Sequence, residues 1–168
     1  MKLLHELIPS PRAGKRFVNI YRLIRASVGD RDRSLFVGDA AKGGEHRCAL
    51  LLLAMLTGYP AEATEILGEL IREEHAETWW TLIDNLKVSK TSASGKPAAK
   101  GQRRQAAGQD FSAIANGGLQ AQRWEGLFSK LDSIRPNLED RPCGSFGKWA
   151  PQIARYSFQS GRVLLGTR

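Results

Sequence analysis

SPRAGKRFVNIYRLIR, residues 10–25, encodes an amphipathic helix with a well-defined start. Ser10 is a favourable N-cap, and Pro11 suits the first helical position because its fixed φ fits a helix and its missing N–H is not needed there. Apolar residues then recur three and four positions apart, which predicts one buried stripe. The stripe consists of Ala13, Phe17, Ile20, Ile24 and Val28. We expect the helix to end at Gly29.

The same helix carries five basic residues and no acid. Arg12 stands in its first turn, where the positive end of the helix dipole attracts anions. Lys15 and Arg22 lie opposite the apolar stripe, and Arg16 lies on its flank. The pattern predicts an anion-binding face in which Arg12 meets the anion and the other three support it. The simpler interpretation is a solvated face, with Arg16 paired to an acid elsewhere in the chain.

The segments on either side are predicted from the same signals. Residues 1–8 resemble the end of a helix that Pro9 stops, and residues 30–44 are Gly-rich and polar, typical of a loop. Within that loop, Leu35-Phe36-Val37 could pin the segment to the core or form a short strand. Residues 45–57 form the most apolar segment and are expected to be a central helix, closed by Gly58 and Pro60. Two further helices are expected over residues 61–74 and 76–87.

Residues 61–84 carry seven acids against one base, so we expect an acidic surface there, which could pack near the basic first helix. Residues 88–109 contain five basic residues and no acid or aromatic residue, which favours a disordered basic insertion. Helices are expected again over residues 118–134 and 149–158.

The sequence thus predicts one all-α domain of about five or six helices. Its parts would be lid-like helices over residues 1–87, the basic insertion, and C-terminal helices over residues 110–168. Residues 160–168 are expected to be frayed.

Composition narrows the class of partner. The 168 residues have a net charge of +8 and a pI near 9.9, which favours anionic partners. Two cysteines provide no disulfide framework, and three scattered histidines show no metal-ligand spacing. Because the longest apolar run is too short for a bilayer and no signal peptide is recognisable, a cytoplasmic protein is expected.

Catalytic motifs are missing from the sequence. The nearest approach to a phosphate loop is Gly95-Lys96, but Pro97 follows where a hydroxyl is required and Lys90 stands in place of the first glycine. No nucleophile elbow, H-E-x-x-H or C-x-x-C occurs either. We therefore do not expect the chain to be an enzyme by itself.

The Pro11-Arg12-x-x-Lys15-Arg16-Phe17-x-Asn19 stretch resembles the helical lid that follows the nucleotide-binding core in KAP- and STAND-type P-loop NTPases. Residues 149–158, WAPQIARYSF, are similar to the end of such regions. The resemblance implies that Arg12 is the second sensor arginine of AAA+-like lids, which contacts the γ-phosphate of ATP. Since the P-loop core is absent, it implies a truncated or split product that meets ATP and Mg²⁺ only through a P-loop partner.

Two other interpretations stay open. The basic helix and the basic insertion could neutralise nucleic-acid phosphates, or the chain could be a helical interaction domain without a ligand. Trp79 and Trp80 point about 100° apart on a helix, so one of them is expected to mark a partner interface.

Overall fold

The computed structural model describes residues 2–38, 44–72, 78–94 and 110–156, and every named element in those ranges is helical. The order is η1 (Lys2–Leu7), α1 (Pro11–Ser27), α2 (Asp30–Val37), α3 (His46–Gly58), α4 (Pro60–Ile71), α5 (Trp79–Ser94), α6 (Asp110–Ile134), η2 (Arg135–Asn137), α7 (Cys143–Gly147) and α8 (Ala150–Ala154). The all-α prediction is confirmed, with more helices than expected.

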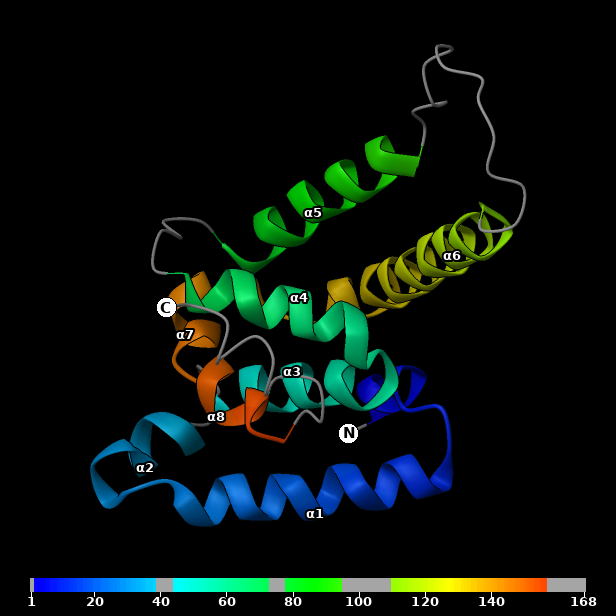
Figure 1. Cartoon of the computed structure of the whole chain (residues 1–168). Helices are drawn as coiled ribbons and strands as arrows, with labels where there is room; N and C mark the ends of the chain where they lie inside the picture. Colours follow the sequence, from blue (N-terminus) through cyan, green and yellow to red (C-terminus); the bar gives the residue numbers. More distant parts are fainter. Residues whose placement is uncertain (1, 39–43, 73–77, 95–109, 157–168) are drawn as a thin grey trace, which may run out of the picture.

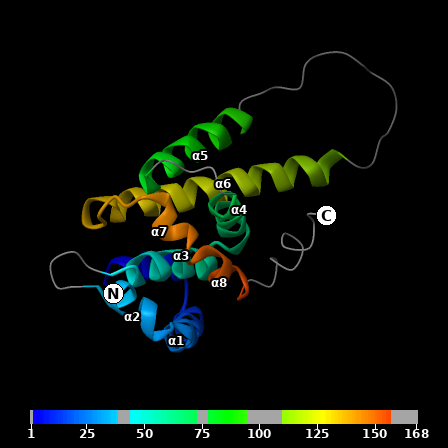
Figure 2. The same ribbon diagram turned by 90° about the vertical axis from the view of Figure 1, so that its left-hand side faces the viewer.

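The helices are arranged around α3 (Figure 1). From Cys48 to Leu56 every residue of α3 except the half-buried Leu50 is buried, because helices cover it on several sides. α1 packs along one side of α3, while α4, α7 and α8 pack on others. Figure 2 shows α5 and α6 on the far side of α3 from α1. The prediction of an apolar central helix is therefore confirmed.

α1 begins and packs as its sequence predicts. The side chain of Ser10 accepts a hydrogen bond from the backbone N–H of Ala13 at 3.2 Å, with Pro11 as the first helical residue. Phe17 and Ile24 are buried, and Ile20 is half-buried against the same core. These contacts fix which face of α1 is left to solvent.

Close packing of two backbones explains why the residue at the end of α3 is glycine. A Cβ at Gly58 would overlap the carbonyl oxygen of Leu7, at the end of η1. Any side chain at this position would therefore push η1 away from the core, in which Leu7 is only 1% exposed.

The loop predicted over residues 30–44 is wrong in part, because α2 occupies residues 30–37. Asp30 and Asp32 lie in its first turn, where carboxylates interact favourably with the positive end of the helix dipole, and Gly38 ends it with φ 71°. Only Phe36 of α2 is buried; its ring packs on Tyr21 and on Trp149, with ring centroids 4.8 Å apart in the second pair. The apolar residues Leu35, Phe36 and Val37 are consecutive and show no helical period, so the sequence pointed to a contact with the core but not to a helix.

Two more boundaries require correction. α5 continues through residues 88–94, which composition had placed in a disordered insertion, and α6 begins at Asp110 rather than at residue 118. Lys90 helps to anchor the extension, since its ammonium bonds Glu65 of α4 and lies 4.9 Å from the centre of the Trp124 ring. Residues 95–109, the remainder of that insertion, and the expected frayed tail lie outside the described residues.

The C-terminal region is more regular than predicted. η2 and α7 lie between residues 135 and 147, where no helix was expected. The helix expected over residues 149–158 is α8, which ends at Ala154. None of the helices in the described part of the chain combines the length and apolarity that a membrane span requires.

Candidate anion-binding face on α1

The predicted site residues of α1 share one exposed face. At 100° per residue, Arg12, Lys15, Arg16 and Arg22 fall within an arc of about 120°, and all four side chains are exposed. From Arg12 to Arg22 the row extends about 15 Å along the helix axis. Arg12, Lys15 and Arg22 therefore lie on the solvent side of α1, with Arg16 at the edge of the same face, and their role in anion binding stays a prediction.

Arg12 is held at the very start of the helix. It directly follows Pro11, and the Ser10 cap fixes the backbone on its N-terminal side. Gly14 N–H also bonds the Ser10 carbonyl at 2.9 Å, which completes the first turn. The base of the Arg12 side chain is therefore fixed while its guanidinium extends into solvent.

A cation in this position is disfavoured by the helix itself. The first turn of α1 has no acid, and the exposed N–H groups there carry partial positive charge. Among the described residues, Arg12, Lys15 and Arg22 form no ion pair. An anion bound at this face would relieve that repulsion.

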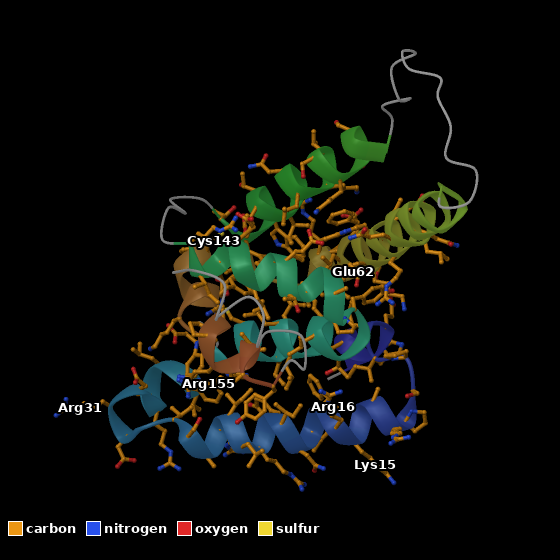
Figure 3. All side chains as sticks on the ribbon, viewed as in Figure 1. Lys15, Arg16, Arg31, Glu62, Cys143 and Arg155 are labelled. Atoms are coloured by element: carbon orange, nitrogen blue, oxygen red, sulfur yellow. The ribbon has the colours of Figure 1, made fainter. Side chains whose placement is uncertain are left out.

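Arg16 differs from its neighbours. In Figure 3 it lies on the side of α1 that faces the other helices, whereas Lys15 projects away from them. One Arg16 guanidinium nitrogen (Nη2) donates to the backbone carbonyl oxygen of Tyr156 at 3.2 Å. Arg16 therefore links α1 to the segment that follows α8, a contact across 140 residues for which no local sequence pattern exists.

Three acids of the surface expected over residues 61–84 form ion pairs away from α1. Glu62, Glu65 and Asp84 pair with bases of the C-terminal half. The partners are Arg123 of α6, Lys90 of α5 and Arg135 of η2 respectively. For these three acids the expected packing near α1 is not found, because they meet α5, α6 and η2, and Figure 2 shows α5 and α6 on the far side of α3 from α1. Glu73, Glu74 and Glu77 of the same segment lie outside the described residues.

The interpretation of Trp79 or Trp80 as a partner interface is also corrected. The two side chains are 0% and 3% exposed. Trp79 stacks on Phe146 with ring centroids 4.3 Å apart, and the Arg135 guanidinium lies 5.1 Å from the centre of the Trp80 ring. The rings do diverge, but each has a partner within this chain because α5 is covered on two sides.

Sequence reasoning missed one buried charge. Glu62 is 1% exposed and accepts from Arg123 through both carboxylate oxygens, at 2.8 and 3.3 Å. A glutamate inside an acidic segment gave no signal of burial. Within the described ranges no three His, Cys, Asp or Glu side chains gather as metal ligands would.

Comparison with known proteins adds no relative to this picture: no family model, no curated protein and no solved structure matches the chain.

Proposed function

We propose that the chain is a non-catalytic helical lid and sensor module for a P-loop NTPase. α1 would dock against a nucleotide held by that partner, with Arg12 contacting its phosphates and Lys15, Arg16 and Arg22 supporting the contact. ATP and Mg²⁺ would be bound by the partner, so the module alone would not hydrolyse ATP. We propose a cytoplasmic location for it, in keeping with Cys48 and Cys143, which are free thiols.

The observation that carries this proposal is the placement of Arg12. A cation at a helix N-terminus lowers helix stability, and no described acid compensates for it. A residue that is unfavourable for its own helix is best explained by an external anion. Guanidinium groups bind phosphate oxygens through two parallel hydrogen bonds, and the fixed helix start limits the positions that the side chain must sample.

The proposed sensing step is electrostatic. A bound γ-phosphate would attract Arg12, and its loss on hydrolysis would remove that attraction, so that the module can shift relative to its partner. The link from Arg16 to the Tyr156 carbonyl would carry such a shift from α1 to the segment after α8. The module would thereby couple the state of the nucleotide to its C-terminal half.

The test is an ATPase assay with P-loop NTPases encoded beside this gene that lack a helical lid. Addition of the wild-type chain should change the ATPase rate of one of them. Because arginines that reach transferred phosphates contribute about 10³-fold or more to rate, Arg12→Gln should abolish most of that change. Arg31→Gln is the matched control, since Arg31 is an exposed arginine on α2, outside the α1 face (Figure 3).

Binding must be measured in parallel, by calorimetry or light scattering. Arg12→Gln should still bind the NTPase if the rest of the module docks. Equal ATPase rates with wild-type and Arg12→Gln chains would refute the sensor role, and no association with any such NTPase would refute the docking role.

Nucleic-acid binding is the second candidate, favoured by the row of cations on α1 that pair with no described acid. Fluorescence anisotropy with double-stranded DNA and single-stranded RNA would test it. Three phosphate contacts from Arg12, Lys15 and Arg22 should give a salt slope of about −2.7 in a log–log plot with duplex DNA. A measurable slope that becomes less steep by about one unit in Arg12→Gln would favour this candidate over the NTPase module.

A further inference from the structure

A cavity of about 300 Å³ lies between η1, the first turn of α3, residues 137–141 and α7, and no residue of α1 lines it. This volume is at the lower end of the range for small-molecule sites. Figure 2 shows α3 and α7 side by side, and residues of both line the cavity. Its apolar wall consists of Leu4, Leu50, Leu138 and Phe146.

Two arginines line the same cavity. Arg47 is exposed and forms no ion pair with a described residue. Arg141 is held more tightly: its side chain is only 16% exposed, and its guanidinium bonds the Glu139 carboxylate at 3.1 Å. Glu139, at 61% exposure, lies at the rim. Two guanidinium groups against one carboxylate leave the lining with one positive charge in excess.

Other groups of the lining do not cancel this charge. Burial raises the pKa of the Cys48 thiol to about 11, against the opposing effect of the Arg141 guanidinium, so that the thiol stays neutral. His46 Nδ1 lies 2.9 Å from the Phe36 carbonyl oxygen and must donate to it, because a carbonyl only accepts. Nε2 is then the ring nitrogen that can bond a ligand.

The first turn of α3 does not add to this preference. Its N-cap, Glu45, makes no side-chain cap bond; its carboxylate accepts from Trp149 Nε1 at 3.1 Å and pairs with Lys148. A carboxylate at this position offsets the partial positive charge of the helix start. The preference for an anion therefore comes from the two arginines that line the cavity.

We propose that this cavity binds a small amphiphilic anion. One carboxylate or phosphate monoester would be held by Arg47 and Arg141, and an apolar body of about ten heavy atoms would pack on Leu138 and Phe146. This site is separate from the α1 face and does not depend on the function proposed for it.

Isothermal titration calorimetry of the full chain tests the proposal with three probes of similar size. 4-Phenylbutyrate and phenyl phosphate represent the two anionic groups, and 4-phenylbutyramide is the neutral control. At least one anion should bind saturably with one site, about tenfold or more tighter than the amide. No saturable binding of either anion at about 10 mM, or equal binding of the amide, would overturn the proposal.

Arg47→Gln locates the site, because Arg47 is exposed and its loss should leave the fold intact. It should weaken anion binding about tenfold, and the matched Arg31→Gln chain should bind as the wild type does. Equal affinities for the wild-type and Arg47→Gln chains would contradict the assignment.

Alkylation of Cys48 gives a second readout that does not depend on a variant. Cys48 lines the cavity, whereas Cys143, which is equally buried, does not. A saturating anion should therefore slow iodoacetamide labelling of Cys48 about fivefold relative to Cys143, as followed by peptide mass spectrometry. Labelling of Cys48 that a saturating anion leaves unchanged, or slows less than labelling of Cys143, would count against the site.

Discussion

The face of α1 and the α4–α6 region use charge in opposite ways. On α1, three exposed cations have no acid to meet in the described part of the chain. Across α4 to α6, bases pair with acids of neighbouring elements: Arg123 with Glu62, Lys90 with Glu65, Lys87 with Asp132, and Arg135 with Asp84. The net charge of +8 is thus unevenly distributed. The charges that link neighbouring elements are neutralised in ion pairs, whereas the three cations on α1 can bind an anionic partner.

The substitution of Arg123 is expected to have the largest effect on stability. Arg123→Gln would leave the carboxylate of Glu62, which is 1% exposed, without its bidentate partner. We expect a loss of about 3 kcal/mol in the free energy of unfolding, measured by urea denaturation at pH 7.

Lys87→Gln is the matched control within the same region. Lys87 and Asp132 are each 45% exposed, so water screens the pair and its loss should cost less than about 1 kcal/mol. If both variants lose the same free energy of unfolding, burial does not determine how much an ion pair stabilises this fold.

The buried thiol of Cys48 extends the comparison to a group that stays uncharged. Its pKa is raised by burial from 9.0 to about 11, so the unfolded chain loses this proton first. The stabilising contribution is fully present below pH 9 and is lost as pH rises toward 11. At its limit the loss is about 3 kcal/mol.

Urea denaturation of wild-type and Cys48→Ala chains at about pH 8, 9, 10 and 11 isolates this contribution. Other groups titrate in both chains, so only the difference between them is used. The stability gap between wild type and Cys48→Ala should shrink as pH rises through this window. A constant gap would show that the thiol ionises no differently in the folded chain.

The features that could be predicted from sequence are those with local causes. Ser10 and Pro11 fix the start of α1, and the apolar run of α3 can only be buried. The solvent face of α1 follows from the same periodicity, which is why Arg12 and Lys15 lie where the pattern places them. Each of these features depends on residues within a few turns of one another.

The features that could not be predicted depend on partners distant in sequence. α2 is held by Phe36 against Trp149, more than a hundred residues later, and its first five residues are all polar. The polar end of α5 is anchored through Lys90 to Glu65 and Trp124. The Arg141–Cys48 contact beside the cavity likewise joins separate segments, so composition alone gave no sign of it.

The cap of α1 gives a smaller effect that tests whether the cationic face depends on a fixed helix start. Ser10→Ala removes the acceptor for the Ala13 N–H and should cost about 1 kcal/mol of stability. Ser10→Asp restores an acceptor and places a negative charge on the helix dipole, so its stability should equal or exceed that of wild type. A stable Ser10→Ala chain would mean that packing alone holds this turn.

The variant that removes the most charge is expected to have the smallest effect on the free energy of unfolding. The triple variant Arg12→Gln, Lys15→Gln, Arg22→Gln removes three cations that pair with no described acid. Its stability should lie within about 0.5 kcal/mol of wild type by urea denaturation. A slight gain is expected, because a neutral amide in the first turn does not oppose the helix dipole and the repulsion between Arg12 and Lys15, three positions apart, is removed. A loss of more than about 1 kcal/mol in the free energy of unfolding would show that these three cations stabilise the fold. The main argument for an external anion would then be lost.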